Sequence, residues 1–122
     1  MLFDTSFLIA VMEHPTPWRE DMLERLGNFR PVVIRPVYEE LSRLAAGKTR
    51  GARYASLAKQ MVDRGQMELQ DSVGDGPADD ELMSRALEEG ALVATVDGAL
   101  IRQLSSSKVS VLRLSGGRVS DR

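Results

Sequence analysis

Short apolar runs alternate along this chain with segments in which apolar residues recur every three to four positions. The apolar runs indicate strands at residues 1–3, 32–34, 67–69, 91–95 and 109–114. Glycine or proline ends most of the periodic segments, which indicate helices at residues 5–12, 18–26, 37–46, 52–63, 78–89 and 98–104. This alternation predicts an α/β protein whose parallel sheet is covered on both faces. The functional groups of such sheets gather outside the carboxyl ends of the strands.

The length of 122 residues suits one domain, spanning residues 1–122, and there is no internal repeat or long linker. The chain has no cysteine and a single histidine, His14. Disulfides, zinc–thiolate sites, iron–sulfur clusters and cysteine nucleophiles are therefore excluded. If the protein is an enzyme, its 18 acidic residues are the groups best suited to the chemistry.

No apolar run approaches the roughly 20 residues that span a bilayer, so we expect no membrane segment. The first residues lack the basic segment and apolar stretch of a secretory signal. We therefore expect a cytoplasmic protein.

Three aspartates share one arrangement. Asp4, Asp79 and Asp97 each precede apolar residues three, four and seven positions later, so each begins the apolar stripe of a helix. Asp4 and Asp97 also end predicted strands, which places both at the carboxyl edge of the sheet. One interpretation is that each aspartate is only an N-cap, whose carboxylate accepts the free N–H groups of the first turn. However, three acids at one sheet edge would repel one another unless a cation neutralised them.

Two further acids border the same region. In the helix predicted for residues 78–89, Asp79 lies near the centre of the apolar arc and Asp80 at its margin. In the helix after Pro36, Glu40 borders the apolar face, although a solvated glutamate is an equally good interpretation. Convergent carboxylates without histidine or cysteine suit Mg²⁺ or Mn²⁺, which activate water and neutralise a phosphoryl transition state.

Four short motifs resemble the PIN domain, a family of metal-dependent ribonucleases. They are Asp4-Thr5-Ser6, Glu40-Leu41, Asp79 with Ala86 seven residues later, and Thr95-Val96-Asp97 followed by Leu100. The resemblance implies a three-layer α/β/α sandwich around a parallel sheet of about four to five strands. It also implies that four acids bind Mg²⁺ or Mn²⁺ and carry catalysis, namely Asp4, Glu40, Asp79 and Asp97.

Three other residues have supporting roles in this resemblance. Thr95 matches the hydroxyl at the end of the family's fourth strand, which hydrogen-bonds a ligand carboxylate or water. Ser6 stands where the family often has asparagine, and it can still bond Asp4 or the substrate. Asp80 is a second acid beside Asp79. The first strand departs from the family pattern, because only three residues precede Asp4.

RNA is the partner that the resemblance implies, either single-stranded or structured. Four basic residues in the region of the third and fourth predicted helices are candidates for phosphate contacts, namely Arg43, Lys48, Arg50 and Arg53. The alternative is an ordinary solvated face. The resemblance makes a homodimer plausible and includes proteins that pair with an antitoxin or act on pre-ribosomal particles. A ribosomal-RNA maturation role and a toxin role therefore both stay open.

Two other functions are compatible with the sequence. Asp71 after the third strand and Thr95 after the fourth permit a phosphoacceptor signalling domain of the receiver type. Against it, the first strand ends in a single acid where receivers carry a pair. The second alternative is a PIN fold used only to bind RNA or a protein, although the retained acids favour catalysis.

Overall fold

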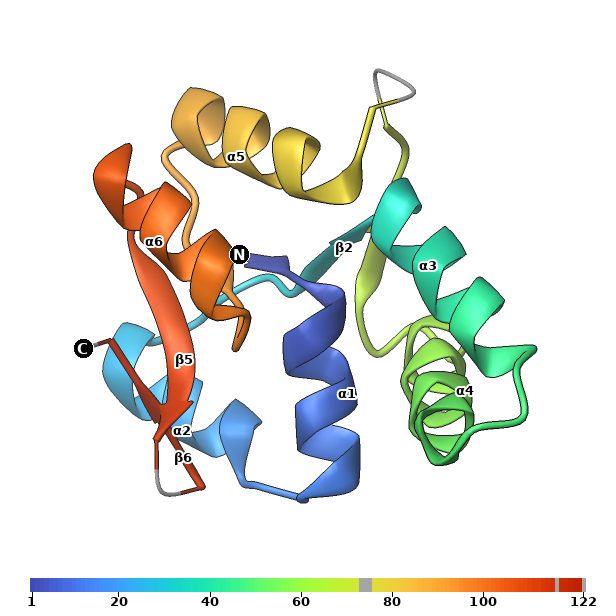
Figure 1. Ribbon diagram of the computed structural model, residues 1–122. Helices are drawn as coiled ribbons and strands as arrows, with labels where there is room; N and C mark the ends of the chain where they lie inside the picture. The colour runs from blue at the N-terminus through green and yellow to red at the C-terminus, as the bar shows by residue number, and fades with distance from the viewer. Residues whose placement is uncertain (73–75, 116, 122) are drawn as a thin grey trace.

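Six strands alternate with six helices in the computed structural model, which describes residues 1–72, 76–115 and 117–121 (Figure 1). The strands are β1 (Leu2–Phe3), β2 (Val32–Ile34), β3 (Glu68–Gln70), β4 (Val93–Ala94), β5 (Val111–Ser115) and β6 (Arg118–Ser120). The helices are α1 (Thr5–Glu13), α2 (Trp18–Leu26), α3 (Arg35–Ala45), α4 (Arg50–Asp63), α5 (Ala78–Glu89) and α6 (Gly98–Ser106). The predicted order of the helices and of the first five strands is confirmed, with bounds that differ by at most a few residues.

All the strands belong to one sheet, in the order β3-β2-β1-β4-β5-β6. The first five strands are parallel, as predicted. Right-handed crossovers in this order place α1 to α4 on one face of the sheet and α5 and α6 on the other. Figure 1 shows α5 above the strands and α1, α2 and α4 below them. The α/β/α sandwich that the resemblance implied is therefore confirmed.

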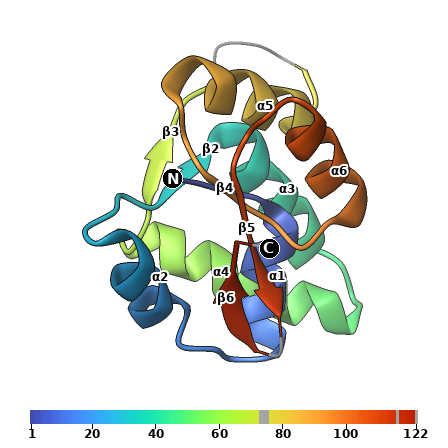
Figure 2. The same ribbon diagram turned by 90° about the vertical axis from the view of Figure 1, so that its left-hand side faces the viewer.

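The sheet contains one strand more than the sequence predicted, because β6 pairs antiparallel with β5. Its one apolar residue, Val119, stands between Arg118 and Ser120, so no apolar run marks β6 in the sequence. Tertiary contacts with α2 hold the strand in place (Figure 2). Arg118 forms an ion pair of 2.6 Å with Asp21, and the buried Val119 donates its N–H to Asp21 Oδ2 at 3.2 Å.

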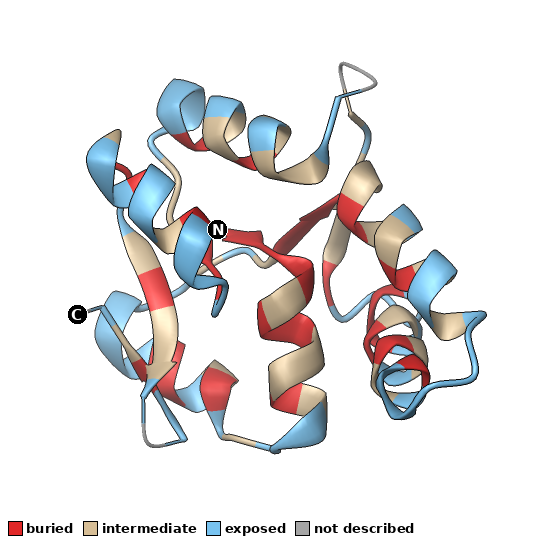
Figure 3. Ribbon diagram, viewed as in Figure 1, coloured by how far each residue is buried: buried red, intermediate tan, exposed pale blue. Residues whose placement is uncertain are grey.

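The core lies between the sheet and the apolar stripes of the helices, as the buried residues in Figure 3 show. Phe3 from β1 contacts both Phe7 and Trp18 edge-on, with ring centroids 5.5 and 5.3 Å apart. These contacts fix α1 and α2 against the end of β1, and so fix the first turn of α1. No helix in the described part of the chain combines the length and the apolar character needed to cross a membrane.

Candidate active site

The candidate site lies where the chain reverses its direction across the sheet. Strands β1, β2 and β3 follow one another to one side, whereas β4 and β5 lie on the other side of β1. Ligands of open α/β sheets bind at such a switch point, outside the carboxyl ends of the strands. The last residues of β1 and β4, Phe3 and Ala94, are paired in register. Asp4 and Thr95 therefore leave the sheet side by side.

Asp4 is nearly buried, with 5% of its surface exposed, and two hydroxyl groups hold its side chain. Ser6 Oγ donates to Asp4 Oδ2 at 2.6 Å, and Thr95 Oγ1 donates to the same oxygen at 2.9 Å. The two hydroxyls in turn accept the backbone N–H groups of Val96 and Asp97, each at 3.1 Å. Asp4 occupies the N-cap position of α1 but makes no capping hydrogen bond. The N-cap interpretation is therefore wrong for Asp4, whose Oδ1 accepts no hydrogen bond from the described residues.

Asp97 behaves differently, because it does cap its helix. Its Oδ1 accepts the backbone N–H groups of Ala99 at 2.9 Å and Leu100 at 3.3 Å, in the first turn of α6. Oδ2 takes no part in this cap. The residue is exposed at the end of the loop that follows β4. Asp97 can therefore cap α6 with one oxygen and still offer the other to a ligand.

Asp79 lies in the first turn of α5 and is half-buried, as is Glu40 on α3. Burial raises the pKa of the Asp79 carboxyl above its ordinary value. The charges of the surrounding acids raise this pKa further, and they come from Asp4, Asp97, Glu40 and Asp80. The acidic cluster of Asp4, Glu40, Asp79 and Asp97 therefore shares one region of negative potential. Asp80 lies beside it and is exposed.

The acidic cluster has the chemistry of a site for a hard divalent cation. Its donors are all carboxylate oxygens, the ligands that Mg²⁺ and Mn²⁺ prefer. No member forms an ion pair with a described residue, whereas five other acids pair with arginines: Asp21, Glu68, Asp71, Glu89 and Asp121. Among the described residues, no three His, Cys, Asp or Glu side chains are grouped closely enough to hold one ion together. The donor set therefore fits such a cation, but some of the side chains would have to move closer to ligate it.

The four basic residues that we predicted to contact RNA phosphates do not form a single patch beside the acidic cluster. Arg43 lines a cleft of about 310 Å³ with Glu40, between α3 and the start of α5. Arg50 bonds Tyr54 and is close enough to Glu13 for that charge to raise the Arg50 pKa. Glu13 ends α1, about 13 Å along the helix from Asp4. Arg43 is therefore near the acidic cluster, whereas Arg50 lies near the far end of α1. Lys48 and Arg53 are exposed to solvent.

Comparison with known proteins identifies the family. A family model described as a PIN like domain matches residues 1–117. The chain belongs to the PIN-like domain family. Sixteen chains of solved structures also match. One is the PIN domain endonuclease Utp24, with 20% identity and a TM-score of 0.81 over 99% of this chain and 90% of that one. At this identity the likeness shows the fold. No curated protein sequence matches the chain.

Membership of the PIN-like family replaces the receiver hypothesis, and the topology gives the reason. Receivers of the CheY type have the strand order 2-1-3-4-5, with β3 central. Here β3 is an edge strand, so Asp71 lies away from the switch point. Its side chain is 85% exposed and pairs with Arg35 at 2.9 Å. Asp71 is therefore not placed like the phosphoacceptor of a receiver.

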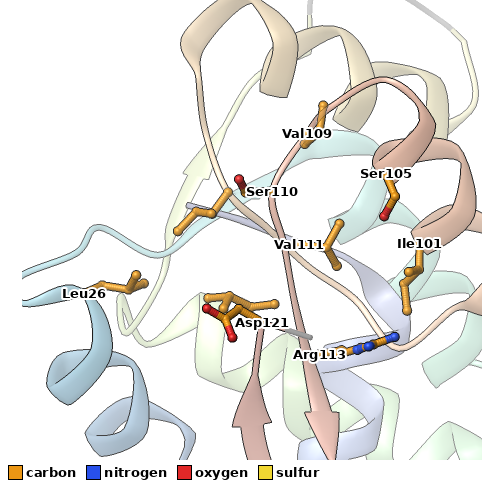
Figure 4. A pocket seen from close by; sticks show the side chains of 10 residues that line it. Leu26, Ile101, Ser105, Val109, Ser110, Val111, Arg113 and Asp121 are labelled. Atoms are coloured by element: carbon orange, nitrogen blue, oxygen red, sulfur yellow. The ribbon is translucent and has the colours of Figure 1, made fainter.

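A separate hollow of about 380 Å³ lies between α6, β5 and the end of α2 (Figure 4). Its lining includes Leu26, Ile101, Val111 and Arg113 but no member of the acidic cluster.

Sequence reasoning missed one group of the candidate site, namely the backbone N–H of Val96, which donates to Ser6 Oγ. A backbone group has no signature in the sequence, so no sequence signal could have found it.

Proposed function

We propose that this PIN-like domain is a ribonuclease that hydrolyses RNA phosphodiesters with Mg²⁺ or Mn²⁺ held by Asp4, Glu40, Asp79 and Asp97. The observation that carries the proposal is the convergence of these carboxylates at the switch point without a cationic partner among the described residues. Such a cluster repels a phosphodiester until a cation neutralises it, so we expect cleavage to depend strictly on metal.

The residues have different parts in this proposal. Ser6 and Thr95 fix the Asp4 carboxylate through Oδ2, which leaves Oδ1 for the cation. Asp97 contributes Oδ2, because the cap of α6 uses Oδ1. When bound, the divalent ion supplies a water of lowered pKa and neutralises charge on the phosphate.

A cleavage assay on single-stranded RNA with Mn²⁺ tests the proposal by comparing the native protein with Asp97→Asn. We expect cleavage by the variant to fall by more than the roughly 10–100-fold that loss of an outer-shell partner costs. Omission of Mn²⁺ should abolish cleavage by the native protein. Equal cleavage by both proteins would remove Asp97 from the mechanism.

The spacing of the acids favours one alternative, a PIN fold that binds RNA or a protein without cleaving it. Among the described residues, no three acidic side chains are close enough to hold one metal ion, and a protein that only binds would not need them to be. Thermal unfolding separates the two functions, because a ligand that binds only the folded state raises the Tm. A Tm that is the same with and without Mn²⁺ or Mg²⁺ would favour the binding module.

We further propose that the protein forms a homodimer. Its partner would be either an antitoxin protein or a pre-ribosomal particle. Ribosomal-RNA maturation and a toxin activity both use this chemistry. An antitoxin gene directly upstream would assign the toxin role, and light scattering would measure the oligomeric state.

A further inference from the structure

Two openings lie on either side of α5, and each is lined by an arginine. The first is the cleft between α3 and the start of α5, which Glu40 and Arg43 line together. The second is a groove of about 690 Å³ between α5 and α6, lined by Met83, Arg102 and Gln103 among others. Figure 1 shows α3 and α6 on opposite sides of the first turn of α1, which follows Asp4. The acidic cluster therefore reaches from one opening to the other: Glu40 lines the first, and Asp97 lies two residues before Ala99, which lines the second.

Arg102 reaches back from the groove toward the acidic cluster. Its Nη1 lies 3.5 Å from the position that a Cβ on Gly98 would occupy. The side chain thus runs one turn toward the start of α6, across the residue that follows Asp97. The guanidinium group therefore lies over the backbone at the start of α6. Arg102 is exposed and forms no ion pair with the described residues.

Arg43 has a matching position on the other side. It follows Glu40 by three residues, so both lie on neighbouring parts of the α3 surface. It is exposed and likewise forms no ion pair with the described residues, although a glutamate lines the same cleft. Several other arginines are already paired with acids, namely Arg25, Arg30, Arg35, Arg85 and Arg118. The guanidinium groups of Arg43 and Arg102 are thus available to an anionic ligand.

We infer that one strand of RNA crosses the carboxyl edge of the sheet from one opening to the other, with Arg43 and Arg102 binding phosphates on opposite sides of the phosphate at the acidic cluster. This inference rests on the proposed function. A guanidinium group suits the task because its donors match a phosphate in a bidentate geometry. Aromatic residues make up only 5% of the chain, so base stacking is a poor alternative source of affinity. Recognition is therefore mainly of phosphate charge and strongly salt-dependent.

Fluorescence anisotropy with a labelled single-stranded oligoribonucleotide tests the inference. Binding is measured in Mn²⁺ on the Asp97→Asn background, in which we expect the RNA to stay intact. Arg43→Gln and Arg102→Gln should each weaken binding roughly tenfold. Each should also reduce the slope of log K against log salt by about 0.7. Arg64→Gln is the control: Arg64 follows the last residue of α4 and lies before the amino end of β3, away from the carboxyl ends of the strands. Its replacement removes the same charge and should change neither the affinity nor the salt slope.

Shortening the oligoribonucleotide from each end tests whether the arginines act on opposite flanks. Loss of one flank should abolish the effect of one arginine variant and preserve the other. If one truncation removes both effects, or if both variants behave like Arg64→Gln while the native protein still cleaves RNA, the inference is wrong and the proposed function stands. If the native protein neither binds nor cleaves RNA, both are wrong.

Discussion

Thr95 donates a 2.9 Å hydrogen bond to Oδ2 of Asp4, a residue 91 positions earlier in the chain. Ser6 donates to the same oxygen, so the orientation of the Asp4 carboxylate is fixed from both β4 and α1. Thr95 is fully buried, and its oxygen also accepts the Asp97 N–H. One hydroxyl thereby links two members of the acidic cluster.

Replacement of Thr95 by valine keeps the shape of the side chain but removes this link. We expect Mn²⁺ affinity and RNA cleavage to fall roughly 10–100-fold, because Asp4 loses the group that orients it. We also expect the free energy of unfolding to fall by about 1–3 kcal/mol, since the Asp97 N–H loses its acceptor. Calorimetric titration with Mn²⁺ and urea unfolding measure the two effects. Thr95→Ser retains the hydroxyl and should restore most of the affinity; equal affinity in Thr95→Val would refute the link.

The two roles of Asp97 can be separated by substitution. Serine caps a helix nearly as well as aspartate, so Asp97→Ser should leave the stability almost unchanged. Asp97→Ala loses the cap and should destabilise the protein by about 0.5–2 kcal/mol. Neither variant has a carboxylate, so both should lose RNA cleavage to the same extent. Cleavage that persists in Asp97→Ser would mean that Asp97 is only a cap.

Asp79→Asn should change stability in opposite directions with and without metal. In the metal-free protein at neutral pH it removes a carboxylate that is desolvated and repelled by its neighbours, so the Tm should rise. With Mn²⁺ at about 100 times the Kd, the native protein gains about 2.7 kcal/mol, and the variant should gain less. Differential scanning calorimetry in both conditions measures the reversal.

The raised pKa of Asp79 also gives this prediction a pH dependence. The folded protein holds its proton to a higher pH than the unfolded chain does. In the absence of metal, its contribution to stability therefore falls as the pH rises from about 4 through the raised pKa. The asparagine variant should lack this part of the pH profile. Parallel profiles for the two proteins would show that the pKa of Asp79 is not raised in the folded protein.

Asp21 has the opposite pH dependence. Its hydrogen bonds from Arg118 hold the pKa of the Asp21 carboxyl below its ordinary value. The stability that it contributes is therefore present above about pH 4 and is lost as the pH falls through the lowered pKa. Asp21→Asn should be less stable than the native protein at pH 7, and the difference should shrink in acid. Urea unfolding at several pH values measures it, and a difference that does not change with pH would contradict the prediction.

Much of the candidate site could be predicted because its members lie at ends of local elements. Asp4 and Thr95 directly follow β1 and β4, and the carboxyl ends of parallel strands meet at one edge. Helical periodicity marks Asp79 as facing the core side of its helix. The antiparallel strand β6 could not be predicted, because it depends on contacts of Arg118 and Val119 with Asp21.

The sequence by itself determined the parallel α/β arrangement and the sheet edge at which the acids gather. Both follow from periodicity and from short-range stop signals, which act within a few residues. Only the tertiary structure decided that Asp97 caps its helix whereas Asp4 is held by Ser6 and Thr95. It also decided that Arg43 and Arg102 remain unpaired among the described residues near the acidic cluster. The bond from Thr95 to Asp4 depends on strand register, namely the pairing of Phe3 with Ala94, and register is set by packing between distant segments.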